Sequence, residues 1–108
     1  MSHACIQLLE QALLIGMQEL EALNEGRTDE AAGREEERSR LTQEAMALSG
    51  DAPLDALRAA FQELCEMQKR LTRAGNELRQ IRQREMTRAR GESRRMAGYR
   101  QAAAHALN

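Results

Sequence analysis

The sequence predicts an all-α fold, an antiparallel bundle or hairpin of three long helices with coiled-coil-like packing. Strand formers are scarce: the 108 residues include no Val, three Ile and only 2% aromatic residues. Ala, Leu, Glu, Gln and Arg, which dominate long helices, are abundant instead. Apolar residues also recur at steps of three and four, which places them on one side of a helix. This length predicts a single helical domain over residues 1–108 with one modest core.

The first helix is predicted over about residues 3–24, with Ser2 as its N-cap. Its apolar stripe is wider than contact with one neighbour needs, so we expect it to be covered on two sides. Gly26 should end the helix, because glycine adopts the left-handed conformation at little cost. The stripe contains Cys5, Ile6, Leu8, Leu9, Ala12, Leu13, Ile15, Gly16, Met17, Leu20 and Leu23.

The second helix is predicted over about residues 29–48, with Thr28 as N-cap and Asp29 and Glu30 in its first turn. Acidic side chains in that turn interact favourably with the helix dipole. The N-terminal half is largely charged, and Gly33 costs about 1 kcal/mol relative to Ala, so we expect that half to be partly exposed. The expected core positions are Ala31, Glu35, Arg38, Leu41, Ala45 and Leu48.

The third helix is predicted over about residues 53–90, because Pro53 suits a first helical turn and a long apolar stripe follows. Gly91 is the best place for a kink or an end, so residues 91–108 form either a continuation or a short fourth helix. A helix of about 38 residues is roughly 57 Å long, against about 30 Å for each of the others. We therefore expect a second copy or a client to cover the excess. The stripe contains Leu54, Leu57, Phe61, Leu64, Met67, Leu71, Ala74, Leu78, Ile81 and Glu85.

Cysteine usage and hydropathy predict a cytoplasmic protein. Cys5 and Cys65 are far apart in apolar helical surroundings, which indicates buried, reduced thiols and no disulfide framework. No basic region precedes the N-terminal apolar stretch, so we expect no signal peptide. No window approaches the roughly 18 to 20 apolar residues of a membrane span.

Charge is unevenly divided along the chain. Residues 1–68 carry fourteen acidic side chains against five arginines, a net charge of −9, whereas residues 69–108 carry a net charge of +8. The basic part could pair with the acidic part, within the chain or across a dimer, or it could attract an acidic protein or nucleic acid. Nucleic acid ranks last, because Tyr99 is the only stacking aromatic and no DNA-binding motif is recognisable.

Catalytic and metal-binding patterns are missing, so we expect no enzyme, no cofactor and no metal site. His3 and His105 lack partners at the spacing of a metal site. The acidic run at residues 35–37 is typical of a solvated helix face. A di-metal bundle would need Glu-x-x-His pairs, which the sequence does not contain.

Two stretches resemble motifs of the small flagellar type III export chaperones of the FliT and FlgN kind. Residues 22–31, followed by 36–41, are similar to the turn after the first helix and the (E)-x-R-x-x-L element of the second. Residues 71–78 are similar to the Asn-containing third-helix segment of FlgN-like proteins. The likeness covers roughly residues 5–85. Thr28, which stands near the place of a bulky residue, and the Arg-rich C-terminal part depart from the pattern and leave client and subfamily open.

The resemblance implies a non-catalytic chaperone, often dimeric, that binds the amphipathic C-terminal helix of a filament-cap or hook-associated protein before export. A groove between helices can accept such a client through anchors at i, i+3, i+4 and i+7. The alternative is a self-associating structural or regulatory coiled-coil protein. For Leu71 we favour a place in the permanent core over a place in the groove. The expected client-binding residues are Leu71, Leu78, Ile81 and Met86, flanked by Arg79, Arg82 and Arg88.

Overall fold

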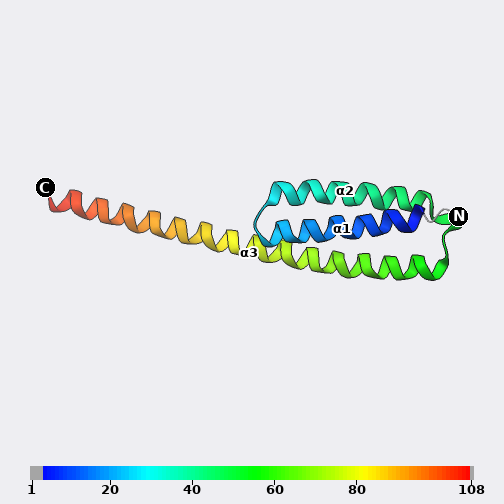
Figure 1. Cartoon of the computed structure of the whole chain (residues 1–108). Helices are drawn as coiled ribbons and strands as arrows, with labels where there is room; N and C mark the ends of the chain where they lie inside the picture. The colour runs from blue at the N-terminus through cyan, green and yellow to red at the C-terminus, as the bar shows by residue number, and fades with distance from the viewer. Residues whose placement is uncertain (1–3, 108) are drawn as a thin grey trace. The chain divides into compact units, whose positions relative to one another are not determined.

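The computed structural model describes residues 4–107, and all regular structure in that range is helical. Three α-helices, α1 (Ala4–Asn24), α2 (Thr28–Ala47) and α3 (Leu54–Ala106), are joined by a short connection after α1 and by the 3-10 turn η1 (Ser49–Asp51) (Figure 1). The predicted all-α fold is confirmed. The predicted cap at Ser2 and the residue His3 lie outside the described residues.

The chain divides into two compact units, Met1–Asn76 and Glu77–Asn108, and α3 contributes residues to both. We call them unit 1 and unit 2 and describe each by itself. In unit 1, α2 runs antiparallel to α1 and to the first part of α3, as the short connections predict (Figure 1). The helix α1 therefore runs in the same direction as α3.

Small side chains line the contact between α1 and α2. Along α1, Cys5, Ala12 and Ala22 are buried, and along α2 Ala31 and Ala45 are buried. Small residues let two helix backbones approach closely, and Cα atoms of α1 and α2 lie within 8 Å of each other at many places. This contact holds α1 and α2 side by side in unit 1.

One ion pair crosses the contact between α1 and α2. Nε of Arg38 donates a hydrogen bond of 2.9 Å to Oε1 of Glu19, and both side chains are largely buried. Each charge compensates the other where water is excluded. The predicted core position of Arg38 on the second helix thus corresponds to a charged contact with α1.

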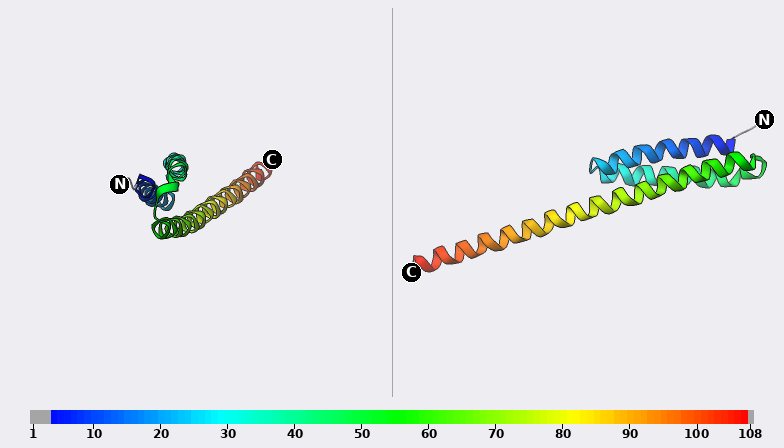
Figure 2. Two further views of the ribbon diagram at one scale, coloured as in Figure 1. Left: turned by 90° about the vertical axis from the view of Figure 1, so that its right-hand side faces the viewer. Right: turned by 90° about the horizontal axis from the view of Figure 1, so that it is seen from below.

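Larger side chains join α3 to this pair. Cys5, Leu9, Ala45 and Ala60 form a buried cluster, against which Ile6, Leu8, Ala52, Leu57, Phe61 and Leu64 pack. The view along the helices in Figure 2 shows that α1, α2 and the first part of α3 do not lie in one plane. All three helices therefore contribute to one core, and α1 is covered on two sides as its wide stripe predicts.

Gly26 ends α1 in the way the sequence predicts. Its φ of +76° is left-handed, and it is the only residue with positive φ in the described part of the chain. The amide of Gly26 donates to the carbonyl of Leu23 (3.1 Å), and the amide of Arg27 donates to that of Ala22 (2.8 Å). This pair of bonds is a Schellman motif, which satisfies carbonyls at the end of a helix.

The predicted helix starts differ by about one residue from the observed ones. Thr28 is the first residue of α2, and Arg27 takes the cap position without a side-chain capping hydrogen bond, although its guanidinium donates to the carboxylate of Glu30. Pro53 lies just before α3 and accepts a 3.0 Å bond from the amide of Leu57. The helix α3 then continues through Gly91 to Ala106, so the residues after Gly91 continue the third helix.

Several residues that the sequence places in the core or on a packing stripe are exposed, among them Met17 of α1 and Leu54 of α3. Cys5 is buried, but Cys65 is exposed, because it lies two residues before the buried Met67 and so on the opposite side of α3. Glu35 of α2 and Leu48, the residue that follows α2, are also exposed. The contact of α2 with α1 follows a single seam of positions seven residues apart, Ala31, Arg38 and Ala45, and this narrow seam leaves residues at its edges in solvent. Both cysteines are free thiols.

Candidate partner-binding face

Unit 2 is the C-terminal part of α3, and its helical state follows from its composition. Arg, Gln, Glu, Ala and Met, all good helix formers, make up most of residues 77–106. Gly91 and Gly98 each cost about 1 kcal/mol relative to Ala, yet the helix passes through both without interruption. Propensity therefore outweighs the two glycines locally.

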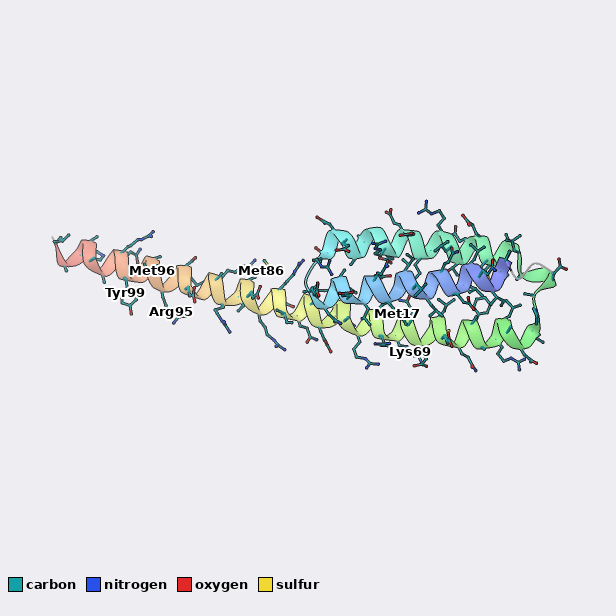
Figure 3. All side chains as sticks on the ribbon, in the orientation of Figure 1. Met17, Lys69, Met86, Arg95, Met96 and Tyr99 are labelled. Atoms are coloured by element: carbon teal, nitrogen blue, oxygen red, sulfur yellow. The ribbon has the colours of Figure 1, made fainter. Side chains whose placement is uncertain are left out.

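Nearly every described side chain of unit 2 is exposed. Leu78 and Gly91 are half-buried, and all other residues from 77 to 107 are exposed. Large apolar side chains among them are Ile81, Met86, Met96, Tyr99 and Leu107, and Figure 3 labels Met86, Met96 and Tyr99. Exposed apolar side chains that lie together mark surfaces that bind other polypeptides, whereas scattered ones are common on any protein surface.

The structure separates the predicted client-binding residues into two groups. Leu71 is 4% exposed and belongs to the buried side of α3 in unit 1, as favoured above. Ile81 is 48% exposed and Met86 is 56% exposed. Arg79, Arg82 and Arg88 are exposed as well. The candidate face therefore consists of six residues of unit 2, Leu78, Arg79, Ile81, Arg82, Met86 and Arg88.

Helical spacing gives this face two edges. Ile81 and Arg88 are seven residues apart and share one edge, and Arg79 and Met86, also seven apart, share the other. Leu78 lies between them, and Glu85, seven residues further on, lies in the same middle row. The face is thus broad, with apolar groups on both edges, arginines beside them and a carboxylate in its centre.

Two exposed apolar residues of unit 2 are not among the predicted client-binding residues. Met96 and Tyr99 are exposed, although only Tyr99 was considered, as a stacking aromatic. The signal was present in the spacing: from Arg82 to Arg100, the residues Met86, Ala89, Ser93 and Met96 follow at alternating steps of four and three. The charged residues between these positions make the row hard to recognise in the sequence.

The two units carry opposite charge. Unit 1 has fourteen acidic against eight basic side chains, a net charge of −6, and unit 2 has eight arginines against three glutamates, a net charge of +5. Arginine donates in a planar fork that suits carboxylates. Unit 2 can therefore attract acidic groups at the edges of its apolar face.

A second apolar surface lies on α3 within unit 1. A shallow hollow there is lined by Leu54, Leu57, Phe61 and Cys65, with Arg58 and Lys69 among its polar neighbours.

Among residues 4–107, no three His, Cys, Asp or Glu side chains gather to hold a metal ion. What the described surfaces offer is contact area and charge.

No protein-family model, curated protein or solved structure matches this chain. None of the helices in residues 4–107 combines the length and the apolar character that crossing a membrane requires.

Proposed function

We propose that this protein is a non-catalytic cytoplasmic chaperone that binds an amphipathic helix of a flagellar export client through the candidate face of unit 2. The observation that carries the proposal is the exposure of Ile81 and Met86 beside arginines on an unbroken helix. The resemblance of residues 22–41 and 71–78 to flagellar export chaperones supplies the class of client.

An amphipathic client helix matches this face in shape and chemistry. Burying a side chain such as Ile or Met contributes about 1.5 to 3 kcal/mol relative to leaving it exposed. A client helix brings apolar groups at i, i+3, i+4 and i+7, and acidic groups at its edges would meet the arginines. The methionine adapts to different partner shapes, since its side chain is flexible. Binding would keep the client's apolar stripe from aggregating before secretion.

The test replaces the two exposed apolar residues together, Ile81→Asp with Met86→Asp. Because both side chains are exposed, helicity by circular dichroism should stay nearly unchanged, while binding of the client helix should be lost. Binding is measured by co-purification with peptides of the C-terminal helices of flagellar filament-cap and hook-associated proteins.

The matched control is Gln80→Asp with Thr87→Asp, which adds the same charge on the opposite side of the same helix. It should bind the peptides like the natural chain. If both variants bind equally well, the face does not hold the client. If the first variant loses its helicity, Ile81 and Met86 serve the fold.

A further inference from the structure

The side of α1 opposite its buried positions carries a row of exposed residues, one of which, Met17, also lines a hollow with residues of α3. Glu10, Leu14, Met17 and Glu21 follow at steps of four, three and four, so they form one seam, which we call the α1 ridge. Leu14 is 60% exposed and Met17 is 54% exposed, and both glutamates are exposed. The ridge thus has two apolar groups between two acids.

The ridge is acidic, although Arg70 of α3 lines a shallow hollow together with Met17 and Glu21. The 21 residues of α1 include no Lys, Arg or His. The third glutamate of the helix α1, Glu19, is buried and paired with Arg38, whereas Glu10 and Glu21 face solvent. A helix complementary to this surface would have apolar groups in its middle and basic groups at both ends.

Unit 2 contains a row with that pattern. Arg79, Gln83, Met86 and Arg90 have the same spacing of four, three and four, and all four side chains are exposed. We call them the α3 seam. Where the α1 ridge has an acid at each end, the α3 seam has an arginine, and the net charges of the two units are also opposite, −6 and +5.

We propose that the α1 ridge of one chain binds the α3 seam of a second copy of this chain. In an antiparallel arrangement Glu10 faces Arg90 and Glu21 faces Arg79, while Leu14 and Met17 cover Met86 and Gln83. Antiparallel helices also bring opposite dipole ends together. A two-fold symmetric dimer contains this contact twice, because each chain offers both surfaces. The proposal goes beyond the proposed function and needs no client.

The test is the dimerisation constant of the full chain, measured by sedimentation equilibrium. We expect a concentration-dependent dimer that weakens as NaCl is raised from about 0.05 to 0.5 M, because salt screens exposed charge pairs. Glu10→Arg with Glu21→Arg should weaken it at least tenfold. The control, Glu35→Arg with Glu36→Arg, changes two exposed acids of α2 by the same charge and should leave it nearly unchanged.

A charge swap makes the test specific for the pairing. Arg79→Glu with Arg90→Glu should also give a monomer alone, but mixing it with the Glu10→Arg/Glu21→Arg variant restores both contacts and should give a heterodimer. A natural chain that stays monomeric overturns the proposal, and so does a mixture that stays monomeric. Equal weakening by the α1 and α2 variants also overturns it. Client binding by the Glu10→Arg/Glu21→Arg variant is measured separately. Neither residue belongs to the candidate face, whereas Arg79 and Met86 belong to both that face and the α3 seam, so the monomeric variant should bind the client at least as well as the natural chain.

Discussion

Gly16 lies where side chains from α2 and α3 come close to the backbone of α1. A Cβ at this position would lie 2.8 Å from Cγ of Met67 and 3.5 Å from Cδ of Arg38. The first distance is shorter than ordinary contact between carbon atoms, so one of the neighbours would have to move. The absence of a side chain at Gly16 therefore lets Met67 fill the core.

Two glycine substitutions in helices should have opposite effects. Gly33→Ala should stabilise the protein by about 1 kcal/mol, because alanine favours the helix and nothing lies within 4 Å of its Cβ. Gly16→Ala has the same gain in propensity, but displacing Met67 costs roughly 1 to 3 kcal/mol, so we expect net destabilisation. Urea unfolding followed by circular dichroism measures both. Equal stabilisation by the two variants would show that Met67 adjusts freely.

Residues whose roles are local could be predicted from the sequence, and residues whose roles depend on a neighbour could not. Gly26 follows a helical stripe directly, so its left-handed conformation was predictable and is confirmed. The need for glycine at position 16 arises from Met67, which lies 51 residues away. The ion pair between Arg38 and Glu19 could not be predicted either. Both residues have charged or mixed neighbours in the sequence, which give no signal for their pairing.

At the scale of elements, unit 2 is a helix with little support from burial. Isolated helices are marginal in water unless they are long and rich in good formers, and most helical stability comes from tertiary packing. The buried residues of α3, Ala60, Met67, Leu71 and Ala74, all precede unit 2. We therefore expect the amides of residues 77–106 to exchange with solvent faster than those of α1.

Replacing the glycines of unit 2 should slow that exchange. In Gly91→Ala with Gly98→Ala, each substitution adds about 1 kcal/mol of helix propensity, and no atom lies within 4 Å of either new Cβ. Hydrogen exchange with mass spectrometry should show severalfold slower exchange in peptides from residues 77–106, with exchange in α1 and α2 unchanged. Unaltered exchange in unit 2 would mean that its helix is already held by other contacts.

The extents of α1 and α2 followed from periodicity and turn residues, whereas the sequence left the end of α3 open at Gly91 and predicted the candidate face only in part. Steps of three and four predicted the stripe that contains Leu71 and Ile81, yet one stripe can pass from core to surface without any change in residue type. Leu71 is buried and Ile81 is exposed because the buried part of α3 ends between them. Where that change occurs depends on the length of α1 and α2, which no local signal within α3 encodes.

At the scale of the whole molecule, the division of charge coincides with a division of structural role. Unit 1 contains every buried residue of the described chain, and unit 2 contributes exposed apolar and basic groups. The unequal charge was predictable from the sequence, but the structure was needed to show that Met17, a member of the predicted stripe of the first helix, lies outside the core. The fully buried residues are thus confined to unit 1, and the described side chains of unit 2 are almost all exposed.

This division predicts that unit 1 folds without unit 2. A chain ending at Asn76 retains the whole buried cluster, so it should unfold cooperatively in urea with nearly the free energy of unfolding of the full chain. The dependence of that energy on urea should also change little, because it scales with the surface that unfolding exposes, and unit 2 is already exposed.

The comparison should be made at low protein concentration and about 0.5 M NaCl, where dimer contacts between exposed charges are screened. Loss of the cooperative transition in the truncated chain would show that residues 77–108 stabilise unit 1. A preserved transition leaves the surface of unit 2 free to serve a partner, since its residues are then not required for the fold.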